Sequence, residues 1–266
     1  MMLSEGQIPL PLRAESVRAE FLERFGQEPS LVVRAPGRAN LLGGHTDYTE
    51  GFVLPLAVNR SVLLAVGHRV DRRFVIHALD LGEQAEFDLD SLSPSSQQPW
   101  TNFHSGVADA LQTRGYQLGG LNAVLTSNVP IGAGLSSSAA VEVAMAFALA
   151  TIFDLEVSRA EMALVGREAE HNFVGMPSGI MDQFISALGR KDHALLLDCR
   201  DLHYEHVPLP PDVRIVVCDT GVRRELAVSE YRVRRAQCEE AVLILQDELS
   251  GIQALRDVSM AQLKRH

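Results

Sequence analysis

The sequence predicts an α+β fold. Segments with the composition of β-strands cluster early in the chain, and the connections between predicted elements vary in length. A regularly alternating parallel sheet would instead repeat its strands and helices at even intervals. No obvious linker divides the 266 residues, so the sequence indicates one large domain, or two small ones with a boundary that composition does not mark.

The first predicted element is a short amphipathic helix. Val17, Phe21 and Phe25 recur every four residues, so they share one face, and Gly26 follows as a stop signal. The next segments are rich in β-branched or aromatic residues and are separated by polar residues, which is typical of strands. These predicted strands are residues 31–35, 53–58, 62–67, 74–78 and 86–89.

The later part of the chain mixes helices and strands. Helical patterns occupy residues 102–114, 139–153 and 224–249, and strand patterns occupy residues 121–127, 193–198 and 214–218. The helix at 139–153 is apolar nearly all round, which predicts that it is buried. Ser158 and Glu161 form a capping box, which predicts a further helix from there to about Phe173. The Ser/Pro/Gln-rich stretch 91–99 is typical of a solvated loop.

Composition narrows the class of protein. The formal charge of −10 argues against a nucleic-acid backbone as the partner. The longest nearly apolar run, residues 143–153, is too short to span a bilayer, and no signal-peptide pattern is apparent. Cys199, Cys218 and Cys238 lack a Cys-x-x-Cys pairing and fit a reducing compartment. We therefore expect a cytoplasmic protein that is not embedded in a membrane.

Residues 130–140 are a candidate phosphate-binding loop. They read Pro-Ile-Gly-Ala-Gly-Leu-Ser-Ser-Ser-Ala-Ala and lie between a predicted strand and the predicted buried helix. Gly132 and Gly134 allow a tight turn and a close approach of the backbone to a ligand. The three serines that follow would place hydroxyl and N–H groups at a helix N-terminus, where the helix dipole favours anions.

This loop matches neither of the common phosphate-binding motifs. Ser137 stands where the dinucleotide fingerprint has its third glycine, and no Gly-Lys-Ser/Thr follows as it would in a Walker loop. On spacing alone, an equally good interpretation is a Gly/Ser turn in which Ser136 merely caps the helix.

A second polar cluster lies between two predicted apolar strands. It consists of Arg38, Asn40, His45, Thr46, Asp47 and Tyr48. A carboxylate such as Asp47 can accept hydrogen bonds from two sugar hydroxyls, and His45 can make one more. The structural alternatives are a surface ion pair for Arg38, a turn for Asp47 and a satisfied side chain for His45. A metal site at His45 and Asp47 is only weakly indicated, because no third ligand has suitable spacing.

The third candidate group lies in residues 168–184. Glu170 is near the end of the helix that Ser158 caps, and Asp182 is in the first turn of the next predicted element, with Ser178 as a plausible cap. The helix dipole favours a charged carboxylate in a first turn, and a charged aspartate beside a hydroxyl is what a phosphoryl-transfer base requires. The simpler interpretation is that Asp182 is an acidic helix-start residue without a catalytic role.

Together these segments resemble one family, the galactokinases. The Gly-Arg-Ala-Asn-Leu-Leu-Gly-x-His-Thr-Asp-Tyr stretch at 37–48 is similar to the galactokinase signature. Residues 130–140 resemble the phosphate loop of the wider GHMP small-molecule kinase superfamily. Residues 179–184 resemble the segment that carries the galactokinase catalytic aspartate, and residues 229–239 are also similar. The resemblance runs from about Phe21 to about Val258, in order and with the expected gaps.

The resemblance implies a two-domain GHMP kinase architecture within the α+β class. Residues 1–205 would form an N-terminal domain of the ribosomal protein S5-like type, which binds sugar and ATP. Residues 206–266 would be the start of a C-terminal domain. The third, glycine-rich GHMP motif is not found before His266, so we expect a fragment or a truncated natural product with an incomplete second domain.

The resemblance also implies a role for individual residues. Asp182 would be the catalytic base toward the anomeric hydroxyl, and Arg38 would stabilise charge on the transferred phosphoryl group and keep Asp182 ionised. Ser138 and Glu170 would bind Mg²⁺. The ATP phosphates would lie on Gly132, Ala133, Gly134, Leu135, Ser136, Ser137 and Ser138, with Trp100 beside the adenine on a looser match. The sugar would contact Gly44, His45, Thr46, Asp47, Gly179, Asp182 and Tyr231.

The implied reaction is phosphorylation of galactose by ATP to galactose 1-phosphate, as in the Leloir pathway. Two alternatives stay open: a galactokinase-like sensor that binds both ligands without turnover, and a GHMP kinase for another substrate such as N-acetylgalactosamine. The second is suggested by Gly44, which stands where galactokinases usually have a glutamate that binds a remote sugar hydroxyl. The expected partners are the sugar and ATP. The sequence does not set the oligomeric state, and a monomer is the default expectation.

Overall fold

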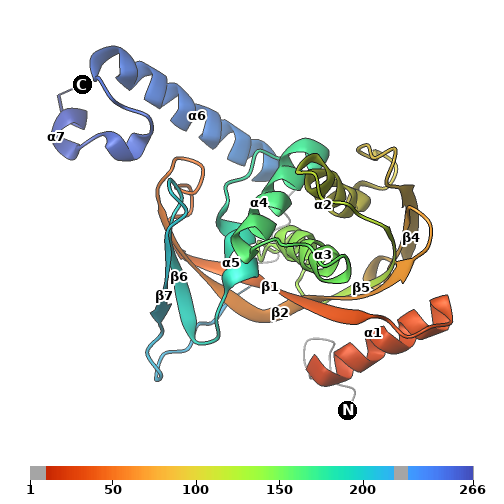
Figure 1. Cartoon of the computed structure of the whole chain (residues 1–266). Helices are drawn as coiled ribbons and strands as arrows, with labels where there is room; N and C mark the ends of the chain where they lie inside the picture. The colour runs from red at the N-terminus through yellow and green to blue at the C-terminus, as the bar shows by residue number, and fades with distance from the viewer. Residues whose placement is uncertain (1–9, 219–226, 266) are drawn as a thin grey trace.

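The structure is a computed structural model that describes residues 10–218 and 227–265. At its centre is one seven-stranded sheet with the order β4-β3-β5-β2-β6-β7, and β1 pairs with β2 outside that path (Figure 1). The strands are β1 (Leu31–Leu42), β2 (Phe52–Arg69), β3 (Arg73–Ala78), β4 (Glu83–Asp88), β5 (Gly120–Ser127), β6 (His193–Asp198) and β7 (Tyr204–Pro208). β3 and β5 run parallel, and the other described pairs are antiparallel. The α+β prediction is confirmed.

The long strand β2 organises this sheet. β1 pairs along one edge of β2, whereas β5 and β6 share its other edge, with β6 beside the N-terminal part of β2. We predicted two strands here, 53–58 and 62–67, because Asn59, Arg60 and Ser61 have the composition of a turn. That break is wrong: β2 continues through these residues, and its register against β1 shifts beside them.

Helices cover both faces of the sheet (Figure 1). The core on one face is formed with α2 (Asn102–Thr113), α3 (Ser137–Ile152), α4 (Arg159–Ala169) and α5 (Met181–Leu188). The other face is covered by α1 (Leu10–Phe25). Successive side chains of β2 point alternately to the two faces of the sheet, so that Leu64 joins the larger core while Leu63 packs with Phe21 of α1. Gly67 permits this close packing, because a Cβ atom there would lie 2.8 Å from the Phe21 ring.

Most predicted helices are confirmed, with one informative difference. Gly26 ends α1 with a φ of 67°, and the Ser158–Glu161 capping box begins α4. The regular helix that we predicted to about Phe173 is wrong in its last turn. α4 ends at Ala169 and is followed by a π-helical turn, η4 (Glu170–Val174), which Gly175 closes in a left-handed conformation. Such insertions are frequent at functional sites.

The C-terminal quarter differs most from the prediction. Residues 214–218 are irregular and exposed, because no strand in the described part of the chain pairs with them, so the predicted strand is wrong. The strand β7 was not predicted, and it crosses the predicted domain boundary at residue 205. The long charged helix is confirmed as α6 (Ala227–Glu248), although its predicted first residues, 224–226, lie outside the described residues.

Short elements complete the described structure. They are the 3₁₀ turns η2 (Leu79–Leu81), η3 (Pro99–Thr101) and η5 (Leu255–Asp257), and the helix α7 (Met260–Leu263). Within residues 10–218 and 227–265, none of the helices combines the length and the apolar character needed to cross a membrane.

Candidate active site

The candidate phosphate loop connects β5 to α3. Gly132 and Gly134 have φ angles of 73° and 76°, in the left-handed region that glycine adopts without steric cost. Ser136 follows with a φ of 56° and is the N-cap of α3, which begins at Ser137. The predicted order of strand, glycine-rich loop and buried helix is therefore confirmed.

The side chain of Ser136 binds α5 rather than α3, the helix that Ser136 precedes. Its Oγ donates a hydrogen bond to Oδ2 of Asp182, and its side chain makes no capping hydrogen bond to α3. The interpretation of Ser136 as a simple helix cap is therefore wrong. Sequence spacing did not suggest this contact, because it depends on how α3 and α5 pack.

Arg38 on β1 joins the loop to Asp182. Its Nε donates to Oδ1 of Asp182 at 2.6 Å, and its Nη2 donates to Oδ2 at 2.7 Å. The remaining nitrogen, Nη1, donates to the carbonyl oxygen of Gly134 at 2.5 Å. Two parallel hydrogen bonds between a guanidinium and a carboxylate are both strong and directional. The two side chains are 11% and 28% exposed, so water screens their attraction only in part.

Gly37 explains why β1 lies so close to the loop. A Cβ atom at this position would lie 2.6 Å from the carbonyl oxygen of Leu135. The same carbonyl accepts a hydrogen bond from the backbone N–H of Arg38 at 3.0 Å. The register of β1 also shifts between Pro36 and Arg38. Together these features place Arg38 between the phosphate loop and α5.

Glu170 lies behind this pair, at the start of the π-helical turn. It is 8% exposed and accepts hydrogen bonds from the hydroxyl of Ser178 and, at 3.0 Å, from Nε2 of Gln183. Burial raises the pKa of Glu170, the Ser178 hydrogen bond lowers it, and the charge of Asp182 raises it again. The two predicted metal-binding residues lie close together, since the Ser138 hydroxyl lowers the pKa of Glu170.

Ser178 does not cap α5, contrary to our prediction. The N-cap is Ile180, and no side chain caps the helix. Ser178 is needed elsewhere, because a buried carboxylate such as Glu170 requires hydrogen-bond donors. Asp182 does lie in the first turn of α5, as predicted.

Glu142 and Gln183 were missed by the sequence reasoning. Glu142 on α3 is fully buried, and its Oε2 accepts from Nε2 of Gln183 at 2.9 Å. The same amide group therefore binds both Glu142 and Glu170. Burial and the charge of Glu170 raise the pKa of Glu142 well above its ordinary range. A single acid within an otherwise apolar helix was the available signal.

The loop between β1 and β2, residues 43–51, brings Asp47 to the same site. A Cβ atom on Gly179 would lie 1.9 Å from Oδ2 of Asp47, so only glycine fits beneath this carboxylate. Burial and the charge of Asp182 raise the pKa of Asp47 to about 6, although Arg38 and backbone N–H groups, including that of Met181, act in the opposite direction.

Aromatic side chains lie on the other side of the Asp47 loop. The backbone N–H of Gly179 donates to the hydroxyl of Tyr231 at 3.1 Å, which connects α6 to the site. The ring centroid of Tyr231 lies 5.2 Å from that of Tyr48, and the Tyr48 hydroxyl is 2.8 Å from Nδ1 of His45. The structure therefore brings His45, Asp47, Gly179 and Tyr231 together, and their role in binding sugar stays a prediction.

Thr46 and Gly44 occupy different positions within that loop. The hydroxyl of Thr46 donates to the backbone carbonyls of Phe52, at 2.7 Å, and of Gly43, at 3.1 Å, so it stabilises the loop itself. Gly44 is exposed, and a Cβ atom there would meet nothing within 4 Å.

Trp100 forms no hydrogen bond or ring contact with the phosphate loop among the described residues. Its Nε1 donates to Glu83 on β4 at 2.6 Å, and its ring lies edge-on to His104. Because β3 and β5 run parallel and β4 follows β3 after a short turn, Glu83 lies at the end of the sheet where β5 leads into the phosphate loop. The role of Trp100 beside adenine stays a prediction.

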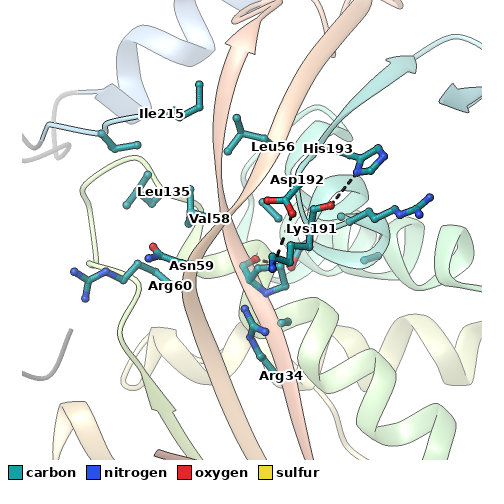
Figure 2. A pocket seen from close by; sticks show the side chains of 18 of the residues that line it. Arg34, Leu56, Val58, Asn59, Arg60, Leu135, Lys191, Asp192, His193 and Ile215 are labelled. Carbon is teal, nitrogen blue, oxygen red and sulfur yellow. Dashed lines mark hydrogen bonds and ion pairs between the residues drawn. The ribbon is translucent and has the colours of Figure 1, made fainter. Parts of the chain in front are cut away.

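A large cavity, of about 1360 Å³, adjoins the site without containing it (Figure 2). Pro130, Ala133 and Leu135 of the phosphate loop line one part, but Arg38 and Asp182 do not line it. The rest comes from β1, β2, α3, α4, α5 and residues 189–193 and 209–218, and its charged residues are mostly basic: Arg34, Arg60, Arg159, Arg190, Lys191 and Arg214, with Asp192.

Family models match two parts of the chain. Residues 102–190, which contain the phosphate loop and Asp182, match the GHMP kinases N terminal domain. Residues 19–68, which contain Arg38 and Asp47, match the galactokinase galactose-binding signature.

Whole proteins are also similar. The chain is 47% identical to a galactokinase of Chloroflexus aggregans and 48% identical to one of Roseiflexus sp., in each case over 94% of this chain and 64% of the relative. Among solved structures, Lactococcus lactis galactokinase complexed with galactose superposes with a TM-score of 0.82 and 30% identity, covering 95% of this chain and 66% of that one. Methanococcus jannaschii mevalonate kinase is similar in fold, with a TM-score of 0.55 and 15% identity over 66% of this chain and 55% of its own.

The chain has the GHMP kinase fold and belongs to that class of proteins. Within the class it is a relative of the galactokinases along nearly its whole length. It spans 64% of the length of the curated galactokinases described above.

Proposed function

We propose that this chain carries the sugar- and phosphate-binding site of a galactokinase, which transfers the γ-phosphoryl group of ATP to the anomeric hydroxyl of galactose. The observation that carries the proposal is the convergence on Asp182. Arg38 binds both oxygens of its carboxylate, and Ser136 of the candidate phosphate loop binds one of them. Asp47, a candidate sugar ligand, lies close enough for the charge of Asp182 to shift its pKa.

Asp182 is proposed to accept the proton of the attacking hydroxyl. A carboxylate oxygen can accept more than one hydrogen bond. Oδ2 already accepts from Arg38 and Ser136, whereas within the described residues Oδ1 accepts only from Nε of Arg38. We therefore assign Oδ1 as the atom that receives the sugar hydroxyl. Arg38 would hold this carboxylate and place positive charge beside the transferred phosphoryl group. Because the transition state of phosphoryl transfer is loose, catalysis depends mainly on such positioning and on electrostatic stabilisation.

The residues near the loop fit a nucleotide with Mg²⁺. Mg²⁺ prefers oxygen ligands and is usually bound by one or two carboxylates together with phosphate oxygens. The described residues contain no cluster of three His, Cys, Asp or Glu side chains, but Ser138 and Glu170 offer a hydroxyl and a carboxylate on adjoining helices. The ion would neutralise charge on the phosphates. Gly132 and Gly134 leave the loop backbone open to phosphate, next to the N-terminus of α3.

The remaining parts of the proposal concern the whole chain. We assign the chain through the end of β7 at Pro208 to the sugar- and ATP-binding domain and the residues after it to a second domain, because the predicted boundary at residue 205 would cut β7 from the sheet. A cytoplasmic location fits the three cysteines, all of which are free thiols.

The test combines sugar binding with turnover. Calorimetry would measure galactose binding to the 266-residue chain, and a coupled assay would measure galactose-dependent release of ADP. We expect both, and we expect Asp182→Asn to lose roughly 10²- to 10⁴-fold in turnover, the range of general-base catalysis, while it still binds galactose. Near wild-type turnover by Asp182→Asn would overturn the assignment of the base. Binding of both ligands without turnover would favour the sensor, and no binding of galactose would contradict the proposal.

A further inference from the structure

The Asp47 loop is also held at its far end, by two arginines that the proposed reaction does not use. Nη1 of Arg256 donates to the backbone carbonyl of Glu50 at 2.6 Å, and its guanidinium lies 4.6 Å from the centroid of the Phe52 ring. Nε of Arg200 donates to the carboxylate of Glu50 at 2.7 Å. Glu50 is thus bound through both its backbone and its side chain.

Both arginines are fixed by carboxylates outside the loop. Arg256 binds the two oxygens of Asp198, the last residue of β6, at 2.5 and 3.0 Å. Arg200, in the turn after β6, pairs with Asp257 at 2.8 Å. Asp257 in turn accepts backbone N–H groups of Gln253 and Ala254, at 2.9 and 3.0 Å. Charge-assisted and paired hydrogen bonds of this kind restrict side-chain orientation more than a single contact does.

The segment that carries Arg256 is itself well anchored. Ile252 and Ala254 are 6% and 4% exposed, and Nε2 of Gln246 on α6 donates to the carbonyl of Ile252 at 2.8 Å. A residue on a buried, hydrogen-bonded segment keeps its position more closely than one on a free end.

The conformation of the loop needs such support. Glu50 has a φ of 57°, in the left-handed region that residues with a side chain seldom occupy. Gly51 N–H closes the turn onto the carbonyl of Thr46 at 2.7 Å, and the Gly51 carbonyl accepts from Cys199 N–H at 2.9 Å. The hydrogen bond from Arg256 to the Glu50 carbonyl stabilises this same turn. On the side of the loop near Asp47, Tyr231 and Arg235 of α6 both contact the ring of Tyr48.

We propose that Arg200 and Arg256 are positioning residues for the sugar site: they hold residues 43–51 in the conformation in which Asp47 rests on Gly179 beside Asp182. The part of this inference that concerns sugar rests on the proposed function. The part that concerns the loop does not, because it predicts a conformational property of the chain without ligand.

Hydrogen–deuterium exchange of the ligand-free chain tests the loop directly. Arg256→Gln and Arg200→Gln should each raise the exchange rate of peptides from residues 43–51, by roughly threefold or more, and the double variant should raise it further. The matched control is Arg73→Gln, because Arg73 also forms an exposed ion pair, at 2.7 Å with Glu86, but on β3 and β4. It should leave exchange in residues 43–51 unchanged.

A second variant guards against a mere loss of folding. Asp198→Asn removes the charge that pairs with Arg256 without altering any side chain of the loop, so it should change exchange in the same direction as Arg256→Gln. Circular dichroism would establish that each variant is folded. Unchanged exchange in residues 43–51 for folded Arg256→Gln, Arg200→Gln and Asp198→Asn would overturn the inference, whatever the chain binds.

Sugar binding then tests the consequence for the site. We expect the Kd for galactose to rise about tenfold in Arg256→Gln, the scale for losing one charge-assisted hydrogen bond, with the Kd for ATP unchanged. Faster exchange with an unchanged Kd for galactose would overturn the role in the sugar site while leaving the loop contact intact. If the wild-type chain does not bind galactose, the proposed function fails and the exchange rates still decide whether the two arginines hold the loop.

Discussion

Arg38 is the residue on which the geometry of the candidate site depends most. All three of its guanidinium nitrogens are used, two by Asp182 and one by the carbonyl of Gly134. A lysine would keep the charge, but it has a single nitrogen and cannot bind both carboxylate oxygens in parallel. The site therefore requires the planar fork of arginine and not only a positive charge.

Replacement of Arg38 should therefore affect turnover more than binding. We expect Arg38→Ala to lower kcat by roughly 10²- to 10³-fold, the scale for losing one preorganised charge-stabilising group. Arg38→Lys should lie between Arg38→Ala and the wild type. Steady-state kinetics with varied galactose would measure both. A kcat for Arg38→Ala within about twofold of the wild type would contradict the role assigned to Arg38.

Asp47 gives the sugar site a predicted pH dependence. Because burial and Asp182 raise its pKa to about 6, its carboxylate gains a proton as the pH falls through that value. The charged form accepts charge-assisted hydrogen bonds at both oxygens, whereas protonation removes the charge and turns one oxygen into an O–H donor, so galactose should bind about tenfold more weakly at about pH 5 than at about pH 7. Asp47→Asn should remove this dependence and His45→Gln should not. Calorimetry at the two pH values tests it, and equal affinity at both would refute it.

Gly44 can be tested as a determinant of sugar preference. A side chain there would meet nothing within 4 Å and its φ is not in the left-handed region, so Gly44→Glu should fold normally. If a remote sugar hydroxyl now lacks a charged acceptor, the new carboxylate should lower the galactose KM by roughly 10- to 150-fold. The gain should be absent for 6-deoxygalactose if that hydroxyl is at carbon 6, and absent in Gly44→Ala. An unchanged KM in Gly44→Glu would show that position 44 does not determine specificity.

At the level of elements, the sequence predicted periodic features well and contact-dependent ones poorly. The α1 stripe, the buried α3 and the capping box of α4 follow from local patterns, and each is present. The continuity of β2 through residues 59–61 depends on its pairing with β1, which local composition does not show. The uses of Ser136 and Ser178 likewise depend on carboxylates that lie 46 and 8 residues away.

Glu142 shows how α3, η4 and α5 are held together. Its buried carboxyl and that of Glu170 share the amide of Gln183, so the three elements meet at one side chain. Oε1 of Glu142 and Oε1 of Gln183 have no hydrogen-bond partner among the described residues. A protonated carboxyl group supplies an O–H donor that a carboxylate lacks. Protonation of Glu142 would therefore remove a buried charge and supply a hydrogen-bond donor where these two oxygens lack one.

The contribution of Glu142 to the free energy of unfolding should depend on pH. The pKa of Glu142 is raised in the folded chain above its ordinary value. Glu142 therefore lowers the free energy of unfolding increasingly as the pH rises from the ordinary glutamate pKa toward the pKa in the folded chain. Glu142→Gln keeps the shape without the charge, so its advantage over the wild type should increase from about pH 5 to about pH 8. Glu142→Leu should cost about 1–3 kcal/mol, because it leaves a buried Gln183 N–H unpaired. Urea unfolding measures both, and an advantage of Glu142→Gln that shrinks with rising pH would contradict this account.

At the scale of the whole molecule, the two sides of the candidate site differ in how well they are packed. The sheet and α2 to α5 enclose a continuous core, whereas the segment after β7 carries apolar side chains in solvent. Val213, Ile215, Val216 and Val217 are 45%, 42%, 79% and 49% exposed, and three of them, all but Val216, also line the large cavity. Apolar side chains that are exposed together on one segment mark a site for association.

We expect this segment to make the 266-residue chain bind apolar dyes and associate with itself. Val216→Ser should reduce the fluorescence of a bound dye such as ANS by roughly a quarter, because it removes one of four neighbouring apolar side chains. It should change the free energy of unfolding by less than about 0.5 kcal/mol, since the side chain is already in water. Val70→Ser is the matched control: Val70 is fully exposed but stands in the turn between β2 and β3, away from this segment. Equal losses of dye fluorescence in Val216→Ser and Val70→Ser would show that scattered exposed side chains, and not the apolar segment 213–217, account for the binding.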